Sequence, residues 1–116
     1  MKEAREEELR SKFNYFVMKP NEGPQEVYDR LMDIVNKRRA LGANLTDLEV
    51  NKRLLQALRP WNSTICSNVR DKDNFKSFTT DEVLGRLLSQ KAQDEEADNI
   101  NKLINKIEED GIRDSP

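Results

Sequence analysis

The chain has 116 residues, of which 35% are hydrophobic and 36% are charged, with a formal net charge of −2. This length and lean apolar content fit one domain with a small core, and the negative charge argues against a general nucleic-acid binder. The sequence contains no histidine, which removes the commonest general base and the usual zinc ligand, so we predict a protein that is not an enzyme and needs no cofactor.

The single cysteine and the polar N-terminus bear on the cellular compartment. Cys66 has no second cysteine with which to form an internal disulfide, which favours a reducing compartment. Residues 1–8 lack the apolar core of a signal peptide, and no apolar run approaches the roughly 18 residues of a membrane span. We therefore expect an intracellular protein, most simply a cytoplasmic one, that does not enter a membrane.

The first two helices are expected on either side of a proline-rich loop. An apolar stripe at helical spacing predicts a helix over residues 3–18. Residues 20–24 contain two prolines and a glycine and form a break. Pro24 suits the first turn of the next helix, and Gly42 suits the position just past its end.

Two capping boxes mark the starts of the third and fifth helices. In each box a threonine caps the amide of a glutamate three residues on, and that glutamate reaches back; the pairs are Thr46 with Glu49 and Thr79 with Glu82. Hydrophobic staples flank both boxes, formed by Leu45 with Val50 and by Phe78 with Val83.

A short fourth helix is expected between the two boxes. Pro60 should end the third helix, because the residue before a proline is pushed out of the α region. Trp61, Ile65 and Val69 then recur at helical spacing. Residues 71–74 are polar and separate this helix from the fifth.

The apolar pattern changes within the last helix. Its packed face is expected to consist of Val83, Leu84, Leu87 and Leu88. Residues 91–99 contain no apolar residue larger than alanine and can bury little. A second stripe then follows, made of Ile100, Leu103, Ile104 and Ile107. Either the fifth helix continues as a long exposed arm, or a separate short helix folds back onto the body.

These signals predict an all-α protein with three parts. A compact five-helix domain occupies residues 1–92, an acidic and amphipathic helical extension occupies residues 93–110, and residues 111–116 form a disordered tail. The sequence shows neither strand alternation nor an internal repeat.

Six segments carry a resemblance to a known family: residues 16–23, 27–31, 34–36, 41–42, 54–61 and 79–87. In this order and spacing they resemble the Gag polyproteins of Copia-type LTR retrotransposons. The most specific feature is Leu-Arg-Pro-Trp at 58–61 followed by the Thr-Thr-Asp-Glu helix start at 79–82. The helical layout resembles the C-terminal lobe of retroelement capsid domains and of their host-domesticated descendants, and residues 1–92 would form this lobe.

The resemblance implies self-association, as a homodimer or in a capsid-like assembly, in an active element or in a host-captured copy. The Cys/His zinc knuckle with which many Gag proteins hold RNA is not in this sequence. RNA is therefore expected to bind only weakly or through regions outside this chain. The alternative function is that of a helical adaptor that binds another protein's peptide or helix in an apolar groove.

The candidate self-association interface consists of Trp61, Ile65, Ile100, Leu103, Ile104 and Ile107. Trp61 fits either the core beneath the third and fourth helices or an interface anchor, since tryptophan is enriched in binding hot spots. The stripe at residues 100–107 has little of its own domain left to cover it. That shortage favours contact with a partner helix or a second copy over a fold-back or a frayed tail.

The charged segments and the cysteine have simpler interpretations. The weak candidates for nucleic-acid contact are Lys37, Arg38, Arg39, Lys52 and Arg53, for which a solvated helix face is the default. Acidic residues 94–98 lack the alternating ligands and the glycine of a calcium loop and are expected to be solvated. Cys66 lies between apolar positions and is expected to be a buried structural thiol.

Overall fold

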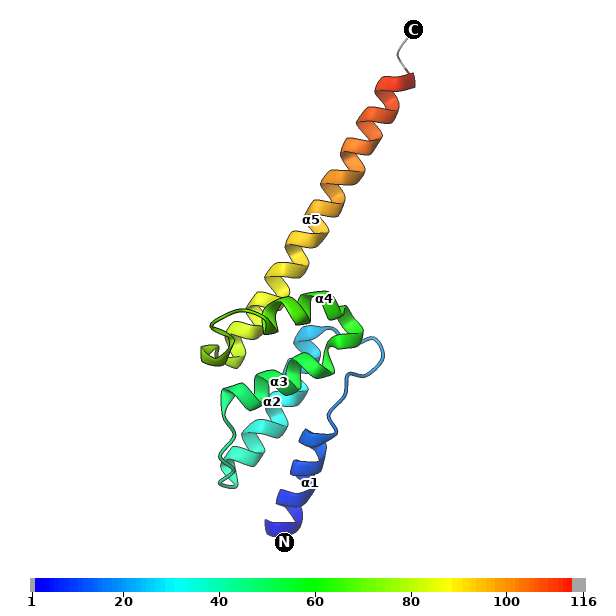
Figure 1. The fold of residues 1–116 in the computed structure, drawn as a ribbon. Coiled ribbons are helices and arrows are strands. Elements are labelled where there is room, and N and C mark those ends of the chain that lie inside the picture. Colours follow the sequence, from blue (N-terminus) through cyan, green and yellow to red (C-terminus); the bar gives the residue numbers. More distant parts are fainter. Residues whose placement is uncertain (1, 114–116) are drawn as a thin grey trace.

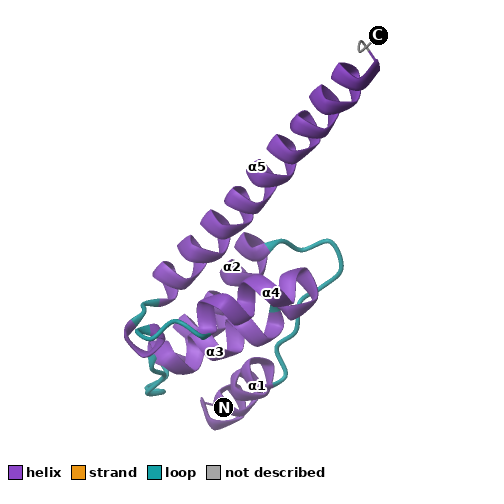
Figure 2. Cartoon of the chain, turned by 45° about the horizontal axis from the view of Figure 1, so that its top comes forward, coloured by secondary structure: helices purple, strands orange, loops and turns teal. Residues whose placement is uncertain are grey.

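The computed structural model describes residues 2–113, and the side chains of residues 4–109. Five α-helices and one short 3₁₀ helix form the fold, and no strand occurs between residues 2 and 113 (Figures 1 and 2). The all-α class predicted from the sequence is therefore confirmed. The elements are α1 (Lys2–Asn14), α2 (Pro24–Ala40), α3 (Asp47–Ala57), α4 (Arg59–Arg70), η1 (Phe75–Ser77) and α5 (Thr80–Arg113).

The first helix is shorter than its apolar stripe suggested. α1 ends at Asn14 rather than near residue 18, and the chain then runs in an extended form toward α2. Arg30 of α2 holds this connector: its guanidinium lies 4.4 Å from the centre of the buried Phe16 ring and donates to the Val17 carbonyl at 2.7 Å. Phe16 is thus buried from a loop, because a tertiary contact outweighs its helical spacing.

The ends of α2 follow the predicted signals. Pro24 occupies the first helical position, where its missing N–H costs no hydrogen bond. At the other end Gly42 has φ +97, a left-handed conformation that glycine adopts without strain. The Gly42 amide donates to the Arg39 carbonyl at 3.0 Å and the Ala43 amide to the Arg38 carbonyl at 2.9 Å. These two bonds form a Schellman motif, which satisfies the last carbonyls of the helix.

Both predicted capping boxes are confirmed. Thr46 Oγ1 accepts the Glu49 N–H at 3.2 Å, and the Glu49 carboxylate accepts the Thr46 N–H at 3.3 Å. Thr79 Oγ1 accepts the Glu82 N–H at 3.2 Å, and the Glu82 carboxylate accepts the Thr79 N–H at 3.5 Å. The starts of α3 and α5 are therefore encoded locally, by side chains that satisfy otherwise unpaired amides.

The junction between α3 and α4 is a kink. α3 ends at Ala57, close to Pro60 as predicted, and the chain turns helical again from Arg59. Asn62 interrupts this turn with an extended backbone (φ −166, ψ 96), and its Oδ1 accepts the Ile65 N–H at 3.0 Å. The longer part of α4 therefore has an asparagine cap of the usual kind.

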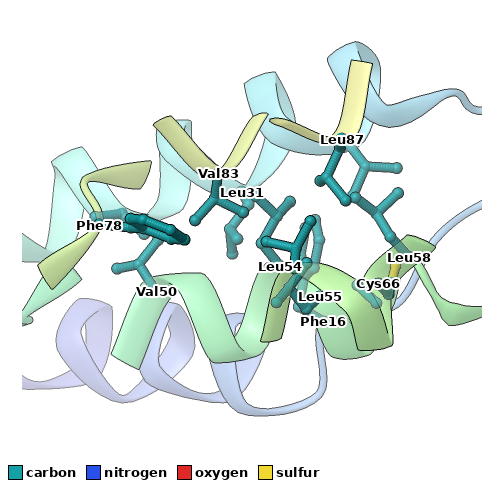
Figure 3. Close-up of a cluster of buried hydrophobic side chains, with 14 of the residues drawn as sticks. Phe16, Leu31, Val50, Leu54, Leu55, Leu58, Cys66, Phe78, Val83 and Leu87 are labelled. Carbon is teal, nitrogen blue, oxygen red and sulfur yellow. The ribbon is translucent and has the colours of Figure 1, made fainter. Parts of the chain in front are cut away.

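The core lies between α2, α3 and the first part of α5, with α4 packed against α3 and α5 and with α1 against α2. Figure 3 shows side chains from these helices and from the connectors before α2 and α5 converging: Phe16, Leu31, Val50, Leu54, Leu55, Leu58, Cys66, Phe78, Val83 and Leu87. Each is buried. The amphipathic stripes predicted for these helices meet in this single cluster, as expected when each helix has one apolar face to cover.

Two polar contacts fix the start of α5 on the body. Asn51 of α3 is fully buried, and its side-chain amide donates to the Phe78 carbonyl at 2.9 Å. The Tyr28 hydroxyl of α2 donates to the Asp81 carboxylate, and this bond raises the pKa of Tyr28 to about 12. Because the helix is anchored at its N-terminal end, its axis is set relative to α2 and α3.

Beyond this anchor α5 leaves the body as an arm (Figure 1). The radius of gyration is 19.9 Å and the longest extent is 80 Å, whereas a compact chain of this length would have a radius of about 13 Å. The structure therefore has the continuous arm, not the separate helix that folds back.

The tail differs in part from the prediction. α5 runs to Arg113, so residues 111–113 are helical instead of disordered, and residues 114–116 lie outside the described part. A helix that is already nucleated adds residues easily, and Gly111 costs only about 1 kcal/mol relative to alanine.

Candidate interaction surfaces

The arm of α5 displays an uncovered apolar stripe. Every side chain from Ala92 to Glu109 is exposed. Ile100, Leu103, Ile104 and Ile107 retain between 45% and 60% of their accessible surface. In the predicted interface set, these four residues are the ones that the structure places together on one exposed face.

This stripe points away from the face with which α5 packs. At about 100° per residue, the arm stripe is rotated by roughly 160° around the helix axis from the buried Val83, Leu84 and Leu87. The stripe is therefore not a continuation of the core face. A partner can reach it from the side of α5 opposite the body.

Leu88 corrects the predicted packed face. Val83, Leu84 and Leu87 are buried, but Leu88 retains 40% of its accessible surface. It lies where α5 leaves the body, so no element of the described chain covers it fully. The helical spacing alone could not show where the neighbouring helices end.

Two residues of the predicted interface belong to the body instead. Ile65 retains only 1% of its accessible surface, so it is a core residue and cannot anchor a partner. Trp61 lies in the kinked turn and is partly buried against the core. Trp61 and Ile65 do not share a continuous helical face, because Asn62 interrupts the helix between them. Ile65 faces inward because α4 packs on α3 and α5.

A second apolar surface lies on the body, at a place that no sequence pattern predicted. Tyr15 and Val17 are exposed, and with Phe16, Met18 and Pro60 they line a hollow of about 350 Å³. Residues 15–18 were expected inside a helix, with only one side facing outward. Because α1 ends at Asn14, both exposed side chains lie beside the α3–α4 turn.

The structure divides the predicted basic residues into two groups. Lys37 forms an ion pair with Asp33 at 2.8 Å. Arg39 donates to the Leu45 carbonyl at 2.9 Å and pairs with Asp47 at 3.3 Å, so it holds the α2–α3 connector. These two cations are engaged within the chain.

The other group lines one hollow. Arg38, Lys52 and Arg53 surround a cavity of about 520 Å³ together with Arg10 and Arg70. The sequence did not single out Arg10 or Arg70, because each is isolated from the basic run in the chain. Only the packing of α1, α2, α3 and α4 brings the five cations together.

The remaining candidates for chemistry show little sign of activation. Cys66 is buried, and burial raises the pKa of its thiol to about 11, so the nucleophilic thiolate is scarce near neutral pH. In the acidic segment, Asp94 accepts a hydrogen bond from Gln90 at 3.0 Å and Glu95 pairs with Lys91 at 3.5 Å. Among the described residues, no three His, Cys, Asp or Glu side chains gather as a metal site.

These observations define an all-α domain with a projecting helical arm. Comparison with family models, with curated proteins and with solved structures finds no match to this chain. Between residues 2 and 113, no helix has both the length and the apolar character needed to cross a bilayer.

Proposed function

We propose that this chain is a non-catalytic assembly domain that pairs with a second copy of itself through the stripe on the α5 arm. The observation that carries the proposal is the stripe itself, four large aliphatic side chains at helical spacing on a segment where every side chain is exposed. Arms with an uncovered apolar face are driven to associate by burial of that face.

A second copy is a suitable occupant of the stripe. A twofold interface needs one surface that complements itself. An aliphatic stripe meets this requirement, because its side chains carry no charge that needs an opposite charge on the partner. Asn99 and Asn101 flank the stripe, whereas Asp98 and Lys102 lie on the opposite side of the helix by the same 100° spacing. Glu96, four residues before Ile100, lies on the side of the stripe, so two copies keep these like charges apart when the arms pair in an antiparallel arrangement.

The available energy indicates a weak and reversible dimer. Burying the exposed half of a large aliphatic side chain contributes about 1 kcal/mol, so four such residues on each of two arms contribute about 8 kcal/mol. Association itself costs an estimated 4–15 kcal/mol. At the lowest of these costs the surplus is about 4 kcal/mol, which corresponds to a dissociation constant of about 1 mM. A stable particle would therefore need many such contacts acting together.

The sequence resemblance supports the same proposal. Capsid domains of Copia-type Gag proteins act by self-association, and the ordered segments at 16–23, 27–31, 34–36, 41–42, 54–61 and 79–87 resemble theirs. Under this proposal the body is a capsid C-lobe-like unit, and the arm supplies one of its contacts. The histidine-free composition and the raised pKa of the buried Cys66 thiol are consistent with a role that involves no catalysis.

Light scattering over a concentration series tests the proposal. The full chain is compared with a chain that lacks residues 93–116, with Ile104→Lys and with Asn105→Lys. Both substitutions add one positive charge at neighbouring exposed positions, but only Ile104 belongs to the stripe. We expect the full chain and Asn105→Lys to dimerise as concentration rises, while the truncated chain and Ile104→Lys stay monomeric.

A full chain in which no dimer is detectable at about 2 mM would overturn the proposal. A dimer that survives both the truncation and Ile104→Lys would move the interface to the body. In that case the hollow beside Tyr15 and Val17 is the next candidate surface for self-association. The monomeric result would instead favour the adaptor function, in which a partner peptide fills an apolar groove.

A further inference from the structure

Five cationic side chains from four helices meet around one hollow. Arg10 comes from α1, Arg38 from α2, Lys52 and Arg53 from α3, and Arg70 from the end of α4. The hollow has a volume of about 520 Å³, within the size range of small-molecule sites. We call this set of five residues the basic hollow.

The charges of the basic hollow are not neutralised. None of the five cations forms an ion pair with a carboxylate of the described residues, whereas Arg30, Lys37 and Arg39 all do. One carboxylate, Glu49, lines the hollow and caps α3 through Thr46. Five cations less this one carboxylate leave the lining with a net charge of +4. Acidic residues outnumber basic ones in the whole chain, 22 to 20. A local group of unpaired cations therefore has the opposite sign to the net charge of the chain.

Two of the arginines are held in place by an aromatic ring. The guanidinium carbons of Arg38 and Arg53 lie 5.4 and 5.7 Å from the centre of the buried Phe13 ring, within cation–π distance. The Arg53 Nε atom is buried and has no hydrogen-bond partner. A buried donor without an acceptor is uncommon in folded proteins, and here it borders a positively charged hollow that could admit one.

We propose that the basic hollow binds a small anion with two or more adjacent phosphoryl groups. Planar guanidinium groups offer paired donors that match phosphate oxygens, and five cations around one cavity match a compact, highly charged solute. This inference is independent of the proposed self-association, since none of the five residues lies on α5.

A compact anion fits this site better than an extended nucleic acid. The cations surround a hollow and do not follow a stripe along the surface. Glu6 lines the adjoining depression together with Arg10 and Arg38, so a long polyanion that left the hollow on that side would meet a carboxylate. Glu7, the next residue of α1, is exposed and adds to the repulsion.

Titration calorimetry of the full chain with inorganic tripolyphosphate at low ionic strength tests the proposal. The variant Arg10→Gln/Lys52→Gln removes two exposed cations from the hollow, and Lys102→Gln/Lys106→Gln removes two exposed cations from the arm. Both double variants lower the net charge equally. We expect the affinity to fall about tenfold or more in the first and less than about twofold in the second, with circular dichroism unchanged in both.

Three outcomes would overturn the proposal. Equal losses in the two double variants would mean that net charge alone attracts the anion. Sulfate that bound as tightly as tripolyphosphate would mean that adjacent phosphoryl groups are not recognised. A thymidine tetranucleotide that bound more tightly than tripolyphosphate, and lost that affinity in Arg10→Gln/Lys52→Gln, would make the hollow a nucleic-acid contact. Each outcome leaves the dimerisation experiment unaffected, so the two proposals can fail separately.

Discussion

The two halves of α5 belong to one helix but owe their conformation to different forces. Residues 80–91 begin with a capping box and bury Val83, Leu84 and Leu87 against α2, α3 and α4. The side chains of residues 92–109 are all exposed. The arm extends by propagation from a nucleus that the body has already formed, because adding a residue to an existing helix is far easier than starting one.

The packed half of α5 stabilises the domain, whereas the arm is available for interaction with a partner. Apolar side chains in the packed half hold the domain together, whereas apolar side chains on the arm contribute almost nothing to the fold of a single chain. The same residue types at the same helical spacing therefore have two roles. Which role applies depends on whether a neighbouring helix reaches that part of α5, and the body ends near Lys91.

The largest expected change in the free energy of unfolding comes from truncating a leucine in the packed half of α5, with a leucine of the arm as the comparison. Leu87 is fully buried and Leu103 is 58% exposed. We expect Leu87→Ala to lower the free energy of unfolding by about 3 kcal/mol, since it leaves a cavity in the core. Leu103→Ala should change it by less than about 0.5 kcal/mol. Urea unfolding followed by circular dichroism at low protein concentration measures both, and equal losses would show that the arm is packed in solution.

An intermediate effect is expected from acid, which should act on the body more than on the arm. Glu22 accepts two hydrogen bonds from Arg30, at 2.7 and 2.8 Å, and one from the Lys19 amide at 2.6 Å. The bond from Arg30 is the main reason that the pKa of Glu22 falls from 4.5 to about 2. Because the folded-state pKa is lowered, this stabilisation is complete above pH 4.5 and is lost as the pH falls toward 2.

The variant Glu22→Gln isolates this contribution. At pH 7 it should be less stable than the natural chain by about 2 kcal/mol, an amount reduced for partial solvent screening. The difference between the two chains should shrink steadily from pH 4.5 to pH 2 in urea unfolding. A difference that stayed constant over this range would mean that the ion pair between Glu22 and Arg30 does not couple protonation to folding.

The smallest expected effect concerns two glycines with opposite constraints. Gly85 lies within the packed half of α5, and an added methyl group would meet no atom within 4 Å. Gly85→Ala should stabilise the chain by about 0.5–1 kcal/mol, because alanine has the higher helix propensity. Gly42→Ala should destabilise it by about 1 kcal/mol, since φ +97 strains a residue with a side chain. Melting temperatures that shift in the same direction would contradict this distinction.

Local signals in the sequence located most of the helix ends. The threonine–glutamate boxes, Pro24 and Gly42 act through atoms within a few residues of one another, so their effect does not depend on the rest of the fold. The sequence did not foresee the buried Asn51, whose amide reaches a carbonyl 27 residues away, nor the early end of α1. Both depend on contacts between distant segments.

The candidate surfaces divide in the same way. The stripe on the arm was predictable from local spacing, because it lies beyond an apolar-poor stretch and no tertiary contact is needed to define it. Ile65 was wrongly assigned to the interface because periodicity shows that residues share a face but not which way that face turns. The basic hollow was only half visible, since Arg10 and Arg70 are distant in sequence from the basic run.

The sequence by itself determined the all-α class, the helix starts and the existence of a second apolar stripe, because capping and amphipathic spacing are short-range properties. The tertiary structure decided that α5 continues as an arm, that its stripe faces away from the body, and that five cations converge around Phe13. Those features follow from how helices pack, and packing is settled by contacts between residues that no local pattern connects.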